Sequence, residues 1–262
     1  IKVVDDHTIS GKMICTPDGG GWGNGDGKPD YTVHFYAQFS KPLKNYGVWS
    51  VAIPEGQSRK REFVESEAFQ QLTAGAEIHR QVSSFEGKHL GFFTEFETAK
   101  DEVVLMKAGI SFVSEENARE NLETEIADWD FERVLQSNQQ AWNEALSKVE
   151  VTSDDEELKH IFYTALYRTM IDPRLYSDAN GEYMGGDKKI HQTGSFQKRT
   201  IFSGWDVFRS EMPLLTLIRP DVISDMLNSL ITLADESGKG YLERWEFLNA
   251  YSGCMIGNPA IS

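Results

Sequence analysis

The chain has 262 residues, of which 40% are hydrophobic and 11% aromatic, so it can fold around a sizeable core. Its formal net charge of −15 argues against nucleic acid or an anionic membrane as a partner, because both need clustered lysine and arginine. No apolar run approaches the roughly 18 residues of a membrane span. The two cysteines, Cys15 and Cys254, have no metal-site or disulfide-framework spacing, which predicts two thiols.

The first part of the chain, to about residue 113, predicts β-structure. In one stretch, Tyr31, Val33, Phe35, Ala37 and Phe39 alternate strictly and therefore share one face of a strand. Short β-branched or aromatic runs bounded by turn residues predict strands over residues 9–15, 31–39, 48–53, 91–96 and 103–112. Several short strands joined by polar connections favour an antiparallel β-sandwich. The polar residues 55–71 predict a partly helical excursion on the surface.

From Ser114 onward the hydrophobic pattern becomes helical. An apolar stripe over residues 131–149 follows Asp130, which predicts Asp130 as a helix N-cap. Residues 153–156 match the capping-box pattern and predict the start of a helix that Pro173 ends. The domains predicted on this basis are a sandwich over 1–113, a helical connecting region over 114–152 and a helical domain over 153–262.

The rest of the helical domain contains turns and two further predicted helices. Turn-forming residues at 178–181 and 185–187 predict a small hairpin that carries Tyr183. A helix is predicted to begin near Trp205, with Pro213 kinking or ending it. Another is predicted from Pro220, in its first turn, to Gly238.

Several familiar site patterns have little support in this chain. The glycine-rich residues 19–28 lack the ending of a phosphate-binding loop, so a solvated loop is favoured, although Trp22 on it could reach a ligand. Asn24, Asp26 and Asp30 lack the bidentate glutamate of a calcium loop. The six histidines form no short-spaced pair for zinc, and no nucleophile elbow is present.

An aromatic, a carboxylate and a guanidinium occur together at Trp205, Asp206 and Arg209. Such a group suits a sugar, whose C–H faces stack on indole and whose hydroxyls need fixed donors and acceptors. A structural alternative is a buried tryptophan with Asp206 as a helix cap paired to Arg209. A second cluster over residues 243–246 follows the next helix, and the two clusters are expected to converge on one site.

Several motifs resemble glycoside hydrolase family 92, the calcium-dependent exo-acting α-mannosidases. The segments that carry the likeness are residues 113–129, 141–146, 162–168, 173–174, 181–183, 203–209 and 253–257. The resemblance implies an α+β multidomain protein, with an antiparallel β-sandwich followed by helical hairpins of an incomplete (α/α)6 barrel. It also implies that Trp205 and Asp206 bind the terminal mannose of a glycan, with Arg209 and Cys254 close by, in a bacterial protein of the periplasm or the extracellular space.

The resemblance further implies inverting hydrolysis assisted by calcium. In that reaction a carboxylic acid protonates the glycosidic oxygen and a carboxylate activates water, with the two carboxyls roughly 6.5–9.5 Å apart. Twelve barrel helices of about 11 residues need more chain than follows Ser153, so the sequence is interpreted as an internal fragment with a processed or cut N-terminus. The acid, the base and most calcium ligands are expected after Ser262, so the fragment alone is expected to be inactive and to self-associate.

A rival hypothesis from another class is a non-catalytic carbohydrate-binding or structural module. Such a module would bind glycan through Trp22 or Trp205 without cleaving it. The mannosidic linkage preference stays open at this point.

Overall fold

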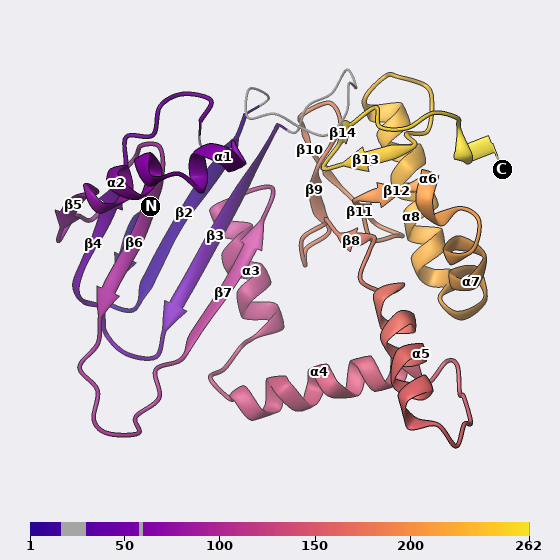
Figure 1. Ribbon diagram of the computed structural model, residues 1–262, viewed down its shortest axis with the longest axis horizontal. Coiled ribbons are helices and arrows are strands. Elements are labelled where there is room, and N and C mark those ends of the chain that lie inside the picture. The colour runs from indigo at the N-terminus through magenta and orange to yellow at the C-terminus, as the bar shows by residue number, and fades with distance from the viewer. Residues whose placement is uncertain (17–29, 58–59, 262) are drawn as a thin grey trace. The chain divides into compact units, whose positions relative to one another are not determined.

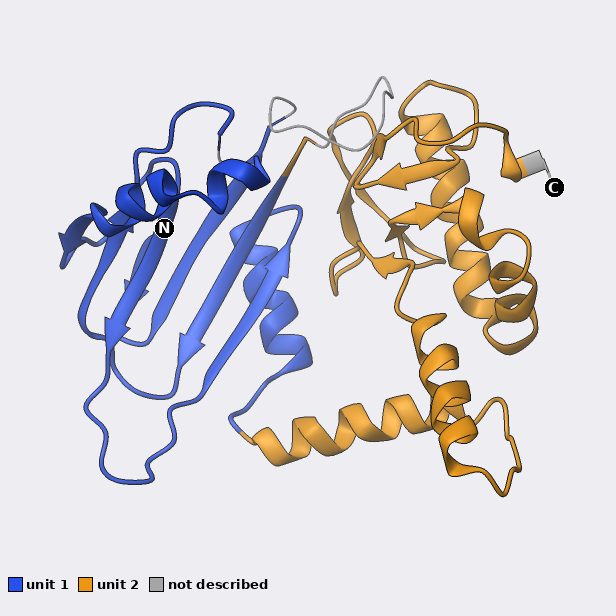
Figure 2. Ribbon diagram, in the orientation of Figure 1, with its two compact units in different colours: residues 1–19, 32–129 blue, residues 20–31, 130–262 orange. Residues whose placement is uncertain are grey.

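The computed structural model describes residues 1–16, 30–57 and 60–261. The glycine-rich residues 19–28, including Trp22, lie outside the described ranges. The chain divides into two compact units, coloured separately in Figure 2. Unit 1 comprises Ile1–Gly19 and Thr32–Trp129, and unit 2 comprises Gly20–Tyr31 and Asp130–Ser262.

Unit 1 is built on two antiparallel sheets, one with the order β1-β2-β3-β7 and one with the order β5-β4-β6 (Figure 1). Their strands are β1 (Lys2–Asp5), β2 (Thr8–Cys15), β3 (Tyr31–Phe39), β4 (Lys44–Ser50), β5 (Glu77–Arg80), β6 (Leu90–Glu95) and β7 (Met106–Ser111). The strands predicted over 9–15, 31–39, 91–96 and 103–112 are confirmed within a few residues. The strand predicted over 48–53 instead begins at Lys44 and ends at Ser50, and β1 and β5 were not predicted.

The core of unit 1 receives side chains from both sheets. Ala37 and Phe39 of β3 are buried, as the alternation of that strand predicts. The Phe39 ring lies 5.7 Å from that of Phe96, just beyond β6, and the Tyr46 ring of β4 lies 6.3 Å from Phe92 of β6. This shared core makes the two sheets a sandwich. The polar excursion predicted over 55–71 contains two short helices, α1 (Arg61–Val64) and α2 (Glu67–Ala74), without buried residues.

Helix α3 (Glu115–Glu125) packs against β7 and belongs to unit 1. Ser114 caps its N-terminus, and the Asn121 amide donates to the Ile110 carbonyl at 2.9 Å. Ala118 and Leu122 are almost fully buried on the side of α3 that meets Gly109. Helix α3 thus lies before the division of the compact units after Trp129, and the boundary near residue 113, drawn from the change in hydrophobic periodicity, stays a prediction.

Unit 2 begins with two helices, α4 (Phe131–Leu146) and α5 (Glu156–Arg168). The predicted cap is confirmed, because the Asp130 carboxylate accepts a 2.9 Å hydrogen bond from the Arg133 amide. The cap of α5 differs from the capping-box prediction: Asp155 rather than Ser153 accepts from the first amides of the helix. Ser153 instead accepts from the Asp155 amide, so it shapes the turn that precedes the helix.

Between α5 and α6, and again after α8, the chain forms short strands that the helical periodicity did not predict, apart from one hairpin. They are β8 (Arg174–Leu175), β9 (Glu182–Met184), β10 (Ile190–Gln192), β11 (Arg199–Thr200), β12 (Phe202–Ser203), β13 (Trp245–Phe247) and β14 (Ala250–Tyr251). The predicted hairpin with Tyr183 is confirmed as β9 and β10, and Tyr183 is buried. Strands of two or three residues fall below the length at which alternation can be recognised.

Three helices and a final 3-10 turn complete unit 2: α6 (Gly204–Val207), α7 (Glu211–Ile218), α8 (Pro220–Glu236) and η2 (Pro259–Ile261). The single helix predicted from Trp205 is wrong in extent, because α6 ends at Val207 and Pro213 lies in the first turn of α7. Pro220 starts α8 as predicted, and Gly238 follows it in a left-handed conformation. Phe202, Met226 and Leu230 form a buried cluster that joins β12 to α8.

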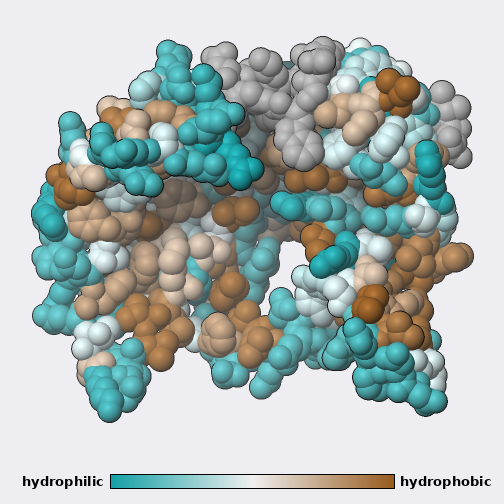
Figure 3. Space-filling view, in the orientation of Figure 1, coloured by the Kyte–Doolittle hydropathy of each residue, from teal (hydrophilic) through white to brown (hydrophobic). Residues whose placement is uncertain are grey.

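The general order is thus an antiparallel sheet domain followed by a helical region, which confirms the predicted fold class. Among the residues that the structure describes, Cys15 and Cys254 are both thiols. No helix in the described ranges is long and apolar enough to cross a bilayer. Hydrophobic side chains, brown in Figure 3, reach the surface of both units.

Candidate sugar-binding site

Antiparallel pairing of β12 with β13 brings the two clusters of the sequence together. Ser203 is opposite Trp245, and Phe202 is opposite Glu246. Gly204 follows directly, and a Cβ placed on it would lie 3.2 Å from the Arg244 carbonyl oxygen. The backbones of the two clusters are therefore in contact within unit 2. The predicted convergence is seen, and its cause is this strand pair rather than equivalent ends of two helical hairpins.

Trp205 and Asp206 form the first turn of α6, directly after this strand pair. The Trp205 side chain is half-buried and that of Asp206 is exposed. The Ser203 hydroxyl donates a short hydrogen bond to the Asp206 carboxylate. Ser203 occupies the N-cap position of α6, so the alternative of Asp206 as a helix cap is wrong. The geometry leaves Asp206 as a carboxylate held at the surface by one hydroxyl.

Arg209 lies in the turn after α6, where its side chain is exposed. Its guanidinium is 5.2 Å from the centre of the Phe208 ring, a cation–π arrangement. The structure therefore gives the Arg209 guanidinium an aromatic neighbour rather than the Asp206 carboxylate that the structural alternative assumed.

Arg244 connects the strand pair to the segment that contains Cys254. Its Nε donates to the Cys254 carbonyl at 2.8 Å, and its Nη1 donates to the Gly257 carbonyl at 2.6 Å. The guanidinium also lies 5.5 Å from the centre of the Tyr251 ring. Cys254 is half-buried, and the contact made by Arg244 is to its backbone rather than to its thiol. Three of the predicted site residues, Trp205, Asp206 and Cys254, thus lie on segments that meet Arg244 or its neighbours.

Glu246 lies under this surface and is 1% exposed. Thr200 donates its hydroxyl to the carboxylate at 2.9 Å, and the backbone amides of Ile201 and Asn249 donate at 2.6 Å each. Burial raises the pKa of Glu246 to about 7, although these three donors favour the ionised form and oppose the rise. The sequence pattern alone predicts no role for Glu246 beyond its place in the 243–246 cluster.

A second buried network lies around Glu236 at the end of α8. Tyr183 donates its hydroxyl to Glu236 at 2.6 Å, and the Gly186 amide donates to the other carboxylate oxygen at 3.0 Å. Burial, together with that carboxylate, raises the pKa of Tyr183. Lys198, 1% exposed, donates to the Ser229 carbonyl at 2.9 Å and lies 5.2 Å from the centre of the Tyr183 ring. Burial lowers the pKa of the Lys198 ammonium.

On the exposed side of this network, His191 pairs with Asp187 at 2.9 Å. The hydrogen bond from His191 lowers the pKa of Asp187 to about 2. No single position of the sequence reveals either network, because their members come from β9, β10, β11, β13 and α8. The one usable signal is the presence of a glutamate and a lysine, Glu246 and Lys198, beside short runs of β-forming residues.

The described residues do not fit a calcium ion. Within the described ranges, no group of three or more His, Cys, Asp or Glu side chains could hold a metal. Three carboxylates with little exposed surface are already engaged: Glu246 by three donors, Glu236 by Tyr183 and Gly186, and Glu243 by Lys239 at 2.8 Å. Calcium needs six to eight oxygen ligands converging on one point, which these carboxylates do not provide.

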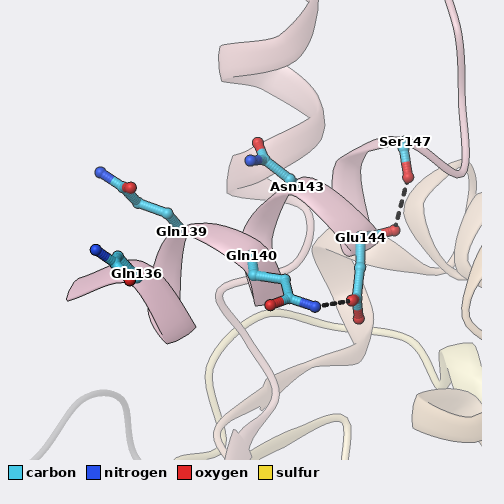
Figure 4. Close-up of a pocket in the computed structure, with 6 residues that line it drawn as sticks. All are labelled: Gln136, Gln139, Gln140, Asn143, Glu144 and Ser147. Atoms are coloured by element: carbon cyan, nitrogen blue, oxygen red, sulfur yellow. Dashed lines mark hydrogen bonds between the residues drawn. The ribbon is translucent and has the colours of Figure 1, made fainter. Parts of the chain in front are cut away.

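A hollow of about 450 Å³ lies elsewhere in unit 2, along one side of α4 (Figure 4). Its lining comes from that helix and the residue that follows it, and consists of Gln136, Gln139, Gln140, Asn143, Glu144 and Ser147. The Gln140 amide donates to the Glu144 carboxylate at 2.9 Å. A wide-open hollow with one carboxylate offers no pair of acid and base groups, so we place the site at β12 and β13.

Comparison with known proteins identifies the family of this chain. The sequence model for the glycosyl hydrolase family 92 N-terminal domain matches residues 1–111, and that for the family 92 catalytic domain matches residues 117–262. The chain therefore belongs to glycosyl hydrolase family 92. The resemblance of its motifs to this family is thus confirmed, and the site described above lies within the match to the catalytic domain.

Solved structures of the family share the fold. A family GH92 α-mannosidase from Bacteroides thetaiotaomicron has 27% sequence identity and a TM-score of 0.76, with 99% of this chain and 31% of that chain covered. The same enzyme is known in complex with mannoimidazole. A family GH92 inverting mannosidase from the same organism has 24% identity and a TM-score of 0.75, with 98% and 32% covered, and shows likeness of fold alone.

A curated relative is an uncharacterised secreted glycosidase from Arthroderma benhamiae. It is 36% identical over 81 residues, which are 29% of this chain and 10% of that protein. This chain thus spans about a third of the length of the solved relatives and a tenth of the curated one. The division into residues 1–113, 114–152 and 153–262 stays a prediction. The two family matches meet close to its first boundary, since one ends at residue 111 and the other begins at residue 117.

Proposed function

We propose that this chain forms part of a glycoside hydrolase that releases terminal α-linked mannose from glycans with inversion. The observation that carries the proposal is the pairing of β12 with β13, which brings the segment that leads into Trp205 and Asp206 against the backbone of Arg244 and Trp245, within the catalytic-domain match. The mannosidase relatives, one of them complexed with mannoimidazole, support mannose as the sugar. The secreted relative supports a periplasmic or extracellular location.

In this proposal the exposed part of the Trp205 indole stacks on the C–H face of the mannose. The Asp206 carboxylate, oriented by the Ser203 hydroxyl, accepts hydrogen bonds from the sugar hydroxyls. Arg209 contributes a guanidinium donor from the turn after α6. Cys254 borders the site through the segment that Arg244 holds.

We assign hydrolysis itself to residues outside this chain, which spans about a third of the length of the solved relatives. An inverting enzyme needs an acid and a base roughly 6.5–9.5 Å apart on opposite sides of the bond that is cleaved. Near Asp206, the buried carboxylate of Glu246 is fully engaged by Thr200, Ile201 and Asn249. We therefore expect this chain to bind mannose without hydrolysing mannosides, and we assign calcium binding to oxygen ligands outside the described residues.

The substitution Asp206→Asn tests the sugar-binding role. It keeps the shape of the side chain but removes its charge, and a charge-assisted hydrogen bond contributes roughly 1.5–3 kcal/mol. The affinity of the chain for mannoimidazole, measured by calorimetry, is expected to fall at least about tenfold, which corresponds to about 1.4 kcal/mol. The melting temperature should stay close to that of the unaltered chain, because Asp206 is exposed.

Asp154→Asn provides the matched control, since Asp154 is also exposed and precedes a helix, α5. It should change neither affinity nor melting temperature. Unchanged affinity of Asp206→Asn with a lowered melting temperature would return Asp206 to a purely structural role.

We also expect the chain to self-associate. Apolar side chains on three helices of unit 2 are exposed, and they are Phe131 and Leu135 of α4, Leu158 and Ile161 of α5, and Leu227 and Ile231 of α8. Pairs three or four residues apart form apolar stripes, which a second copy of the chain can cover. Light scattering at rising concentration should show a mass above 29.6 kDa, and Leu227→Lys together with Ile231→Lys should lower it. A monomer at all concentrations contradicts this expectation.

A further inference from the structure

The Glu246 carboxylate joins two turns that the sequence separates by more than forty residues. One turn is at Ile201, between β11 and β12, and its amide donates to Oε2 of Glu246. The other joins β13 to β14 through Leu248 and Asn249, and the Asn249 amide donates to Oε1. Thr200 completes the arrangement, because its hydroxyl donates to the carboxylate and accepts from the Leu248 amide at 3.0 Å.

Both turns have backbone conformations that their residues rarely adopt. The φ angles are 67° at Ile201, 51° at Leu248 and 65° at Asn249. Positive φ is tolerated by asparagine but is an outlier for a branched residue such as isoleucine. Such conformations persist only where the surroundings hold them, and they gather at functional sites. Here the amides of Ile201 and Asn249 are held by Glu246 and that of Leu248 by Thr200.

The two turns determine where the candidate site residues lie. Ile201 directs the chain from β11 into β12, which leads to Trp205 and Asp206. The turn at Leu248 and Asn249 sets the register of β13, on which Trp245 is opposite Ser203. We propose that Glu246 is a positioning residue, whose ionised carboxylate holds both turns and thereby fixes the strand pair that carries Trp245 and leads into Trp205 and Asp206. The consequence for sugar binding rests on the proposed function, whereas the positioning itself does not.

Protonation should loosen the hold on the two turns, even though it removes the cost of burying a charge and so makes unit 2 as a whole more stable. An ionised carboxylate accepts from both amides at once, but a protonated one must point its own hydrogen at a donor or turn away. Three groups act with Glu246. Glu243 adds to the rise in the pKa of Glu246, and Glu246 in turn opposes the lowering of the Lys198 pKa by burial and adds to the rise that burial causes in the pKa of Tyr176. With the pKa of Glu246 raised to about 7, the position of the tryptophans should change over the neutral range.

Fluorine NMR of the chain labelled with fluorotryptophan tests the proposal. The signals of Trp205 and Trp245 are assigned by replacing each with phenylalanine, and are followed from about pH 5.5 to 8.5. Both signals are expected to move with one shared midpoint near 7, where Glu246 titrates. In Glu246→Gln they should be independent of pH over that range. In Glu211→Gln, which alters a partly buried carboxyl on α7, they should move as in the unaltered chain.

Thr200→Val gives a second test that does not alter the carboxylate. It removes a donor that favours the ionised form, so the shared midpoint should rise by about half a unit or more. Signals that do not titrate, or that titrate equally in Glu246→Gln, overturn the positioning role. A midpoint unchanged by Thr200→Val overturns it as well.

Repeating the titration with mannose present distinguishes the positioning role of Glu246 from the proposed binding of mannose. Binding to the unaltered chain is expected to weaken several-fold as the pH falls through the midpoint of the tryptophan signals. If the signals titrate and depend on Glu246 while mannose binds at no pH, the positioning role stands and the sugar-binding function fails. If mannose binds with an affinity that ignores both pH and Glu246, the positioning role fails and the sugar-binding function stands.

Discussion

Replacing Gly109 with alanine is expected to cost unit 1 about 3 kcal/mol or more of its free energy of unfolding. A Cβ at this position of β7 would lie 2.2 Å from the Ala118 carbonyl oxygen and 2.9 Å from the Leu122 amide nitrogen. Both are backbone atoms of α3, so the overlap cannot be relieved by turning a side chain. The helix would have to move away from the sheet, which exposes Ala118 and Leu122, now almost fully buried.

Urea denaturation measures this effect, and hydrogen exchange at the β7 amides locates it. Gly87→Ala is the matched control in the same unit, because its Cβ would meet Leu90 at 3.4 Å and Phe85 at 3.6 Å, ordinary contact distances. That variant should remain within about 0.5 kcal/mol of the unaltered chain. Equal stability of the two variants would mean that α3 does not pack on β7 as described.

The buried carboxyl of Glu246 is expected to make unit 2 less stable as the pH rises. Its pKa is raised from 4.5 to about 7 in the folded chain, so between these values the folded chain binds more protons than the unfolded one. The stabilisation from this group is therefore fully present below 4.5 and is lost as the pH rises through about 7. A rise in pKa of that size corresponds to about 3 kcal/mol.

The comparison with Glu246→Gln isolates this contribution. Urea denaturation gives the free energy of unfolding of each chain. The value for the unaltered chain minus the value for the variant should fall by about 3 kcal/mol from acid to alkaline pH. The exposed Glu150→Gln should keep the unaltered pH profile. Asp187 does not interfere, because its pKa is lowered from 3.8 to about 2, so its stabilisation is lost only at lower pH. A constant difference across the range would contradict the burial of Glu246.

Local features of the fold were predictable where the pattern is long. The alternation from Tyr31 to Phe39 spans the whole of β3, and a helix cap such as Asp130 acts on its own first turn. Apart from the hairpin of β9 and β10, the short strands of unit 2 were not predictable, because each is two or three residues long and the pairs β8–β11 and β12–β13 join segments far apart in the chain. The extent of α6 was missed because the apolar residues after it continue into α7 without a break in pattern.

The sequence indicated which residue types form the candidate site, but not the buried hydrogen bonds that hold the segments carrying them. Trp205 and Asp206 could be named from their motif, and the strand that precedes them pairs with the 243–246 cluster. Their roles in binding stay a proposal. Glu246 looked like one acidic residue among several, because the sequence does not show that Thr200, Ile201 and Asn249 surround it.

By itself, the sequence determined the change from strands to helices, the helix start at Pro220 and the likeness to a glycoside hydrolase family. These depend on side-chain periodicity, on the conformational limits of proline and on short motifs, all of which are local. Only the tertiary structure decided that β12 pairs with β13 and that Glu246 is buried between two turns. A pKa near 7 is a property of that burial, since desolvation and hydrogen-bond donors come from residues far apart in the chain.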